Sequence, residues 1–269
     1  ASEVFTLWME VADTLTIDAD SAIDVSARGY IPRRTSGNLP SGTDWAGGSH
    51  GGYGAPTHTP VADVYGDFRN PTEPGAGGGG TDYRSRGGGA ARIEAGTLAL
   101  DGAIWADGGN AVAHNTSAGA GGSLHFGVGA ITGSGVITAD GGDNDNDRGA
   151  GGGGRIAIYY DDASGYDLDL VRAIGGQHTD GFAGEGSPGT VYLEDNAGEG
   201  VLVIDSKDLP VAQWTPLGVA EDLTLEMDRL VLRGAGVWVA PHHRMPLSAN
   251  NVDILEQARL FHRRCTASE

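Results

Sequence analysis

Short segments in which apolar residues alternate with small or polar residues recur along the whole chain. Residues 155–160, RIAIYY, are one example, and residues 97–101, TLALD, are another. A period of two over four to eight residues is typical of a β-strand with one buried face. The stretches between these segments are rich in Gly, Asp and Asn, which favour turns and disfavour helix. The pattern predicts an all-β fold, and only residues 252–261 are also compatible with a helix.

The predicted strands recur at a fixed interval. Four units align with one another, and each has a first segment that leads to a second. These are residues 14–18 followed by 22–29, 97–101 followed by 103–109, 130–133 followed by 135–142, and 166–170 followed by 171–176. Ala106, Ala139 and Ala173 occupy equivalent positions, so the spacings are 33 and 34 residues. A further predicted strand opens each unit, at residues 91–94, 123–126, 155–160 and 189–193. Such a period indicates units that stack on a continuous core.

We therefore predict a right-handed parallel β-helix (β-solenoid). A propeller is the alternative, but its blades need four strands joined by hairpins. The expected inward-facing positions are Leu98, Leu100, Ile104, Ile131, Ile137, Ile156, Ile158, Val191 and Leu193. Residues 1–269 are expected to form a single domain, with a glycine-rich insertion at residues 30–86 that packs on its flank. Strand-like segments reach both ends, which favours an excised part of a longer chain.

Composition narrows the classes of partner. The net charge of −19 predicts that the chain binds neither nucleic acid nor anionic lipid surfaces, since such binding needs clustered Lys and Arg. The acidity is compatible with a solubility surface, a salty habitat or cation binding. The single cysteine, Cys265, excludes an intrachain disulfide. Because no apolar run approaches about 18 residues, we predict no membrane insertion.

Several glycine-rich segments resemble those of a known class of proteins. These are GGSHGGYG at residues 47–54, NPTEPGAGGGG at 70–80, TLALDGAIWADGGN at 97–110 and GAGGGGRIAIYY at 149–160. They are similar to the glycine-rich parallel β-helix repeat regions of large bacterial extracellular and surface proteins. The resemblance covers roughly residues 1–200. It implies an extracellular or cell-surface location and a role in adhesion or polysaccharide handling.

One loop carries candidate metal ligands. Asp140, Asp143, Asp145 and Asp147, with the intervening asparagines, place oxygen atoms along a flexible segment. Calcium takes six to eight such oxygens, so the loop is a candidate calcium site, and a solvated acidic turn is the alternative. The loop lacks the last glutamate of an EF-hand. The histidines are scattered and show no zinc-site spacing.

Aromatic side chains are the candidate ligand-binding residues. Trp45 and Tyr53 lie in the insertion, Trp105 follows an inward-facing residue of a predicted strand, and Tyr159 and Tyr160 follow the acidic loop. Exposed aromatic rings in these positions could stack on sugar rings, and local packing under the insertion is the alternative. We predict a non-catalytic module for adhesion or for binding a polysaccharide or cell-surface glycan.

The alternative is a β-helix polysaccharide lyase or glycoside hydrolase. Hydrolases of that fold use clustered Asp with a His motif and an Arg–Ile–Lys signature. Asp161 with Asp162, residues 48–51 (GSHG) and Arg155 with Ile156 are superficially similar. However, the His motif comes first along this chain, and Ala157 stands in place of the lysine. For a lyase, Arg148 is the candidate proton acceptor, with an ordinary surface arginine as the other interpretation.

Overall fold

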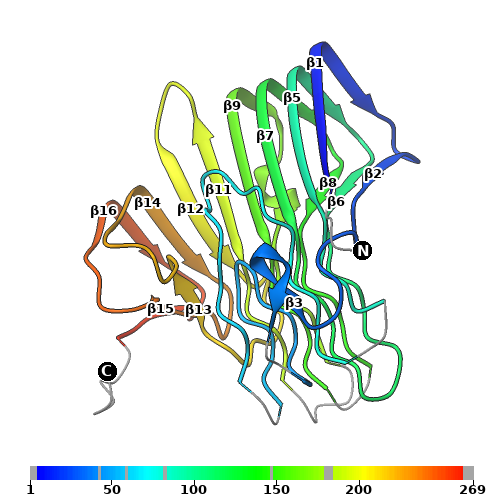
Figure 1. Ribbon diagram of the computed structural model, residues 1–269. Helices are drawn as coiled ribbons and strands as arrows, with labels where there is room; N and C mark the ends of the chain where they lie inside the picture. The colour runs from blue at the N-terminus through cyan, green and yellow to red at the C-terminus, as the bar shows by residue number, and fades with distance from the viewer. Residues whose placement is uncertain are drawn as a thin grey trace.

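The computed structural model describes residues 5–41, 44–57, 60–80, 84–145, 148–178 and 184–262. Its largest element is an eight-stranded sheet, whose strands lie side by side in Figure 1. The order of its strands is β1 (Thr6–Ile17), β5 (Ala90–Leu100), β7 (Ser123–Gly133), β9 (Arg155–Tyr166), β11 (Thr190–Asp195), β12 (Gly200–Asp205), β14 (Leu225–Arg233) and β16 (Leu247–Ile254).

A second sheet stands beside the N-terminal part of the first. It contains β2 (Ala22–Asp24), β6 (Ala103–Trp105), β8 (Val136–Thr138) and β10 (Val171–Arg172), in the order β10-β8-β6-β2 and all parallel. The register aligns Ile104 with Ile23 on one side and with Ile137 on the other, and Ile137 with Val171. The row of aligned side chains that runs through Ile104 is therefore apolar along its whole length.

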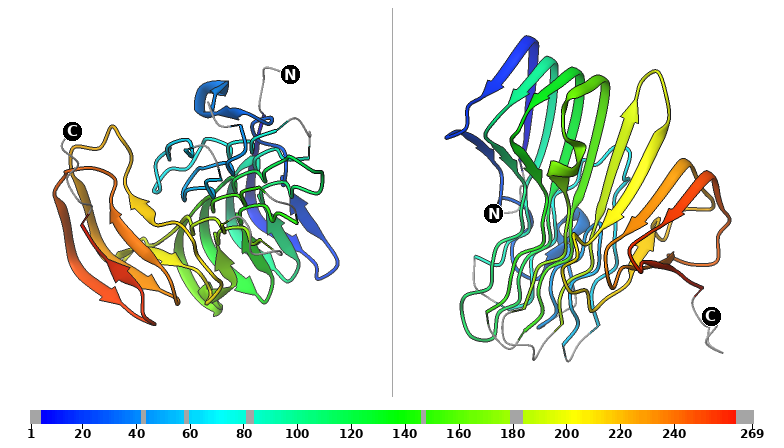
Figure 2. Two further views of the ribbon diagram at one scale, coloured as in Figure 1. Left: turned by 90° about the horizontal axis from the view of Figure 1, so that it is seen from below. Right: turned by 180° about the vertical axis from the view of Figure 1, so that it is seen from behind.

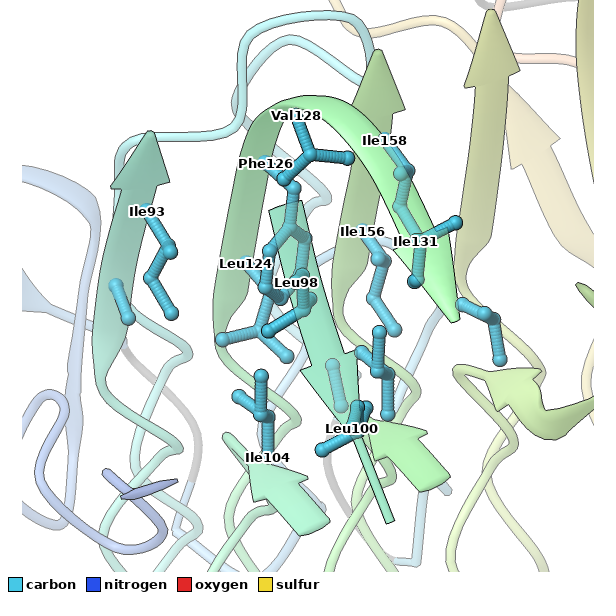
Figure 3. Close-up of a cluster of buried hydrophobic side chains, with 14 of the residues drawn as sticks. Ile93, Leu98, Leu100, Ile104, Leu124, Phe126, Val128, Ile131, Ile156 and Ile158 are labelled. Atoms are coloured by element: carbon cyan, nitrogen blue, oxygen red, sulfur yellow. The ribbon is translucent and has the colours of Figure 1, made fainter. Parts of the chain in front are cut away.

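The main hydrophobic core fills the space between these two sheets. The positions that the alternating pattern predicts to face inward include Leu98, Leu100, Ile104, Ile131, Ile137, Ile156 and Ile158, all with 0% exposure. Val191 is also buried, and Leu193 is half-buried. Figure 3 shows several of these side chains gathered between the strands. Burial of each large aliphatic side chain contributes about 1.5–3 kcal/mol, so this core is the main source of stability.

The remainder of each unit consists of extended glycine-rich segments that bond to several neighbours at once. Within residues 117–122, amides that lie three residues apart donate to carbonyl oxygens of the same neighbouring segment. Ser117 and Ala120 donate to Gly79 and Ala76, and Ala118 and Gly121 donate to Gly149 and Gly152. Gly119 and Gly122 donate to Gly109 and Ala106. Residues 149–154 repeat this pattern with segments 45–48, 184–187 and 139–142. A repeat of three residues per turn, with bonds only to other segments, is the geometry of a polyproline II helix. We call this part the glycine array.

Close packing, rather than backbone conformation, requires glycine in the array. A Cβ on Gly121 would lie 2.0 Å from the carbonyl oxygen of Ala139, and a Cβ on Gly151 would lie 1.9 Å from that of Gly119. Neither glycine has a positive φ. Alanines such as Ala118 and Ala120, at 0% exposure, occupy positions where a methyl group fits. The abundance of glycine therefore reflects how closely these backbones approach one another.

The segment between β2 and β5 supplies part of the glycine array. It contains β3 (Arg34–Thr35), the 3-10 helix η1 (Ser36–Asn38) and β4 (Leu39–Pro40). Its glycines then bond across the array: Gly48 donates to the carbonyl oxygen of Ala118, and Gly75 donates to that of Gly88. Much of the region that the sequence assigns to a flanking insertion therefore shares backbone hydrogen bonds with the strand-bearing units.

The prediction of a right-handed parallel β-helix is wrong. The eight-stranded sheet is mixed rather than wholly parallel, because the chain reverses direction after β11 and β12 pairs with it antiparallel. No closed solenoid is formed by the described residues. The remainder of each unit is glycine array, in which each segment divides its backbone hydrogen bonds among several neighbours and so does not form the continuous parallel strands of a β-helix.

A second core forms on the opposite face of the large sheet. Val191 pairs with Val203 and Tyr192 pairs with Leu202 across the reversal. Successive residues of a strand face opposite sides, so the valines join the first core, whereas Tyr192 and Leu202 join the second. The strands β13 (Thr215–Leu217), β15 (Trp238–Pro241) and β17 (Arg259–Leu260) form a small parallel sheet. Figure 2 shows these C-terminal strands at the end of the sheet remote from β1.

Helix is scarce in the part of the chain that the structure describes. Besides η1, it contains the 3-10 helix η2 (Leu168–Leu170). Residues 252–261, for which the sequence left a helix open, instead contain the end of β16, a turn and β17. None of the described segments forms a helix long and apolar enough to cross a membrane.

Candidate functional site

The two predicted aromatic residues of the insertion lie against other side chains. Trp45 is 36% exposed, and the guanidinium of Arg148 lies 4.7 Å from the centre of its ring. Tyr53 is half-buried, with its ring edge-on to Trp214 at 5.2 Å. Its hydroxyl donates to Oδ1 of Asp63 at 3.0 Å. Both rings therefore take part in local packing.

The three aromatic residues predicted on strands face different directions. Trp105 is 37% exposed at the end of β6. Tyr160 packs against the first core. Tyr159, its neighbour on β9, faces the other side and stacks on His125 with ring centres 5.4 Å apart. The five predicted ligand-binding aromatics therefore do not form one platform.

The acidic loop uses its first aspartates to join neighbouring units. Oδ1 of Asp140 accepts a hydrogen bond from the amide of Ile174 at 2.9 Å, and Oδ1 of Asp143 accepts one from the amide of Gln177 at 2.8 Å. Asp145 is exposed, and Asp147 lies outside the described residues. No group of three or more His, Cys, Asp or Glu among the described side chains has the geometry to hold a metal ion. Calcium binding stays a prediction.

Asp140 has an unusual electrostatic environment. It is 8% exposed, and burial together with the nearby charge of Asp107 raises its pKa to about 7, against the opposing influence of Arg172. Nε of Arg172 lies 2.8 Å from Oδ2 of Asp140. Both carboxyl oxygens of Asp140 thus have protein partners, so this residue serves the connection between units.

A concave site lies elsewhere, between residues 66–69 of the insertion and residues 218–226. Its volume is about 510 Å³. We call it the Arg155 pocket, and it is lined by Gly66, Asp67, Phe68, Arg69, Arg155, Gly218, Val219, Asp222, Thr224, Leu225 and Glu226. Clefts of this size with a few convergent polar groups are the usual form of small-ligand sites.

Arg155 is the central residue of this pocket. It is the first residue of β9 and is 2% exposed. Its Nε donates to the carbonyl oxygen of Tyr65 at 2.9 Å, and its Nη1 donates to Oγ1 of Thr190 at 3.2 Å. Among the described residues, none accepts a hydrogen bond from Nη2. Burial lowers the pKa of Arg155 to about 10, and the negative charge of Asp67 and Asp222 opposes this shift.

Two carboxylates line the pocket with this arginine. Oδ1 of Asp67 accepts from the amide of Arg69 at 2.8 Å, and Oδ2 of Asp222 accepts from the amide of Val219 at 2.8 Å. In each carboxylate, the second oxygen accepts no hydrogen bond from the described part of the chain. The pocket therefore presents open donor and acceptor groups together.

A buried histidine stands behind the pocket. His50 is 0% exposed, and its ring lies 4.8 Å from that of Tyr65. Its Nδ1 lies 2.8 Å from the carbonyl oxygen of Gly121 and must carry the proton, because a carbonyl only accepts. Burial and the charge of Arg155 lower the pKa of His50 to about 3. Residues 48–51 and Arg155 thus meet in space, whereas Asp161 and Asp162 are exposed farther along β9.

Sequence reasoning placed Arg155 in a strand but did not identify the pocket. The partners of Arg155 lie at residues 65–69 and 218–226, which are brought to it by the long insertion and by the chain reversal after β11. The one available signal was an arginine at the start of an otherwise apolar strand. Its buried guanidinium needs polar partners from other segments.

Comparison of the chain with protein-family models, with curated proteins and with solved structures found no match. The resemblance to glycine-rich bacterial surface proteins stays a prediction.

Proposed function

We propose that this protein is a non-catalytic glycan-binding module of a secreted or cell-surface bacterial protein, and that the Arg155 pocket is its binding site. The observation that carries the proposal is the guanidinium of Arg155, whose Nη2 has no protein acceptor among the described residues although the side chain is 2% exposed. A charged donor at the wall of a pocket can donate to a ligand that enters it. Nη2 is not among the fully buried polar atoms, so it remains open to the pocket.

The hydroxyl groups of a sugar complement this set of side chains. A hydroxyl both accepts and donates hydrogen bonds. It can accept from Nη2 of Arg155 while it donates to the open oxygen of Asp67 or Asp222. Two neighbouring hydroxyls of one sugar ring would satisfy the arginine and a carboxylate together. A simple anion would satisfy the arginine but would be repelled by the two carboxylates.

The charge of the protein favours a neutral glycan. The formal net charge is −19, and the pocket itself has three acidic residues, Asp67, Asp222 and Glu226, against two arginines. A field of this sign lowers the local concentration of polyanions. Adhesion through neutral polysaccharide chains is therefore the form of binding that we propose.

One observation favours a second candidate function, a glycoside hydrolase. Asp67 and Asp222 line the same cavity, and glycoside hydrolysis generally uses two carboxyl groups on either side of the scissile bond. The binding proposal takes precedence because each of these carboxylates already accepts a hydrogen bond from a loop amide. Those bonds give each carboxylate a positioning role in its loop.

Affinity measurements with a panel of soluble neutral polysaccharides test the proposal. The informative variant is Asp222→Asn, which keeps the size of the side chain and an oxygen for the amide of Val219. The matched control is Glu221→Gln, an exposed neighbour that does not line the pocket. We expect a glycan that binds the unaltered chain and the control but binds Asp222→Asn at least about tenfold more weakly, since hydrogen bonds to charged groups contribute about 1.5–3 kcal/mol.

The same incubations are assayed for new reducing or unsaturated ends. New ends that form with the unaltered chain but not with Asp222→Asn would show that the protein is an enzyme and not a non-catalytic binding module. If no glycan in the panel is retained, or if Asp222→Asn binds as well as Glu221→Gln, the pocket is not the binding site and the proposal fails.

A further inference from the structure

Two adjacent histidines follow β15, at a place where the insertion meets the C-terminal part of the chain. Nε2 of His242 lies 2.7 Å from Oδ1 of Asp63, a contact between residues 179 positions apart. The same carboxyl oxygen accepts from the hydroxyl of Tyr53 and from the amide of Val64, each at 3.0 Å. Three donors therefore fix Asp63, and Asp63 fixes the imidazole of His242.

The contact with Asp63 decides which nitrogen of neutral His242 carries the proton. Burial raises the pKa of Asp63, but the hydrogen bond and charge of His242, with the bonds from Tyr53 and Val64, bring it below its usual value. The carboxylate is thus ionised and acts only as an acceptor. Neutral His242 must place its proton on Nε2, which leaves a lone pair on Nδ1.

The second histidine presents its own Nδ1 to this lone pair. The Nδ1 atoms of His242 and His243 lie 3.4 Å apart. Zinc binds histidine nitrogens at about 2.0–2.1 Å, so two nitrogens on one tetrahedral ion lie roughly 3.3–3.4 Å apart. We propose that His242 and His243 together bind one divalent transition-metal ion through their Nδ1 atoms.

Asp63 then has the role that carboxylates commonly play behind metal-bound histidines. Such a carboxylate accepts the other ring N–H, orients the imidazole and increases its basicity. His242 is 9% exposed and held in place, whereas His243 is half-buried and can adjust to the ion. The site is therefore rigid on one side and accessible on the other.

The ligand set defines the class of metal. Imidazole nitrogens suit Zn²⁺, Ni²⁺ and Cu²⁺, whereas Ca²⁺ and Mg²⁺ require oxygen ligands. Among the described residues, no third His, Cys, Asp or Glu completes a cluster around this pair. The described residues thus supply two imidazole ligands, and binding should follow the order Cu²⁺ above Zn²⁺. This site is separate from the acidic loop at residues 140–147.

A direct hydrogen bond between the two imidazoles is the competing interpretation, and titration of the metal-free chain with zinc chloride by calorimetry distinguishes the two. We expect one Zn²⁺ per chain, and no binding in His243→Ala. Asp63→Asn keeps both ligands and should bind about 10–100-fold more weakly, as for other residues that support a metal-bound histidine. His114→Ala, which removes an exposed histidine of another loop, is the matched control and should bind normally.

Electron paramagnetic resonance of the chain with one equivalent of Cu²⁺ provides a second measurement without a variant. Coupling to two imidazole nitrogens is expected. Absence of zinc binding, zinc binding that survives His243→Ala, or a copper spectrum with fewer than two nitrogens would each overturn the proposal. Loss of zinc binding in His114→Ala but not in His243→Ala would show that the site lies at another histidine, and this result would also overturn the proposal.

Discussion

The backbone amide of Asp140 donates a hydrogen bond of 2.7 Å to Oδ1 of Asp107, which lies 33 residues earlier in the chain. Asp140 in turn accepts from the amide of Ile174 at 2.9 Å. The side chains thus continue the pairing of β6, β8 and β10 beyond the ends of these strands. Placing one carboxyl group above another in a buried position has an electrostatic cost, which appears as the raised pKa of Asp140, about 7.

The first prediction concerns the pH dependence that follows from this cost. In the native state Asp140 stays protonated up to about pH 7, whereas in the unfolded chain it ionises near pH 3.8. Between these values the native state binds more protons, so this group lowers the free energy of unfolding as the pH rises. Between pH 5 and pH 8, the free energy of unfolding of Asp140→Asn should therefore fall by roughly 2–3 kcal/mol less than that of the unaltered chain.

Urea denaturation at the two pH values measures this difference. Glu199→Gln, which removes an exposed carboxylate between β11 and β12, is the control and should keep the decline of the unaltered chain. An equal decline in Asp140→Asn and in the control would show that Asp140 does not titrate in this range.

The second prediction tests the packing of the glycine array. In Gly121→Ala, the new Cβ would lie 2.0 Å from the carbonyl oxygen of Ala139, so two backbone segments must separate. We expect the free energy of unfolding to fall by about 3 kcal/mol or more, above the usual range for overpacking because backbone atoms, not side chains, must move. Thermal unfolding followed by circular dichroism measures the loss.

Gly198→Ala is the matched control. Gly198 lies in the exposed turn between β11 and β12, where a Cβ would come no closer than 3.3 Å to the side chain of Asp195. It should change the free energy of unfolding by less than about 0.5 kcal/mol. Similar stability of the two variants would contradict the close packing described for residues 117–122.

The alternating pattern predicted the strands and the first core because both depend on local side-chain polarity. Ile104, Ile137 and Ile156 are fully buried, as a period of two requires. The same pattern could not reveal the glycine array, since glycine has no side chain from which to read a buried face. The glycine-rich stretches were therefore expected to be turns, whereas in the structure their backbone segments pack directly on one another.

The reversal of the chain after β11 was the other feature that the sequence could not give. A strand such as residues 201–205 has the same alternation of apolar and polar residues whether it pairs parallel or antiparallel with the strand before it. The Arg155 pocket depends on that reversal, because Asp222 and Thr224 reach Arg155 only after it. Asp140 was predicted from sequence as a calcium ligand, and the structure adds that its oxygens accept hydrogen bonds from Arg172 and Ile174 of the next unit, which the sequence alone could not reveal.

The third prediction concerns a hydroxyl in the first core. The hydroxyl of Tyr166 donates to the carbonyl oxygen of Gly135 at 2.9 Å, and burial raises the pKa of this tyrosine. Tyr166→Phe leaves that carbonyl without its partner and should lower the free energy of unfolding by about 1 kcal/mol.

Tyr160→Phe is the control for this change. Its hydroxyl makes no hydrogen bond with the described residues, although its ring also packs on the first core. We expect its free energy of unfolding to stay within about 0.5 kcal/mol of the unaltered chain. Equal effects in the two variants would show that the bond from Tyr166 to Gly135 contributes nothing to stability.

The last prediction concerns His50 at the back of the Arg155 pocket. Burial and the charge of Arg155 lower its pKa to about 3, so at pH 5 it should be neutral, with its proton on Nδ1 toward the carbonyl of Gly121. In the unfolded chain it ionises near pH 6.5, so below that pH the unfolded state binds more protons. This group therefore lowers the free energy of unfolding as the pH falls from 6.5 toward 3, opposite in sign to Asp140. Nitrogen-15 NMR of the imidazoles at pH 5 measures the tautomer directly. A His50 that carries protons on both ring nitrogens at pH 5 in the folded protein would contradict the burial of this site. It would also contradict the geometry on which Arg155 depends.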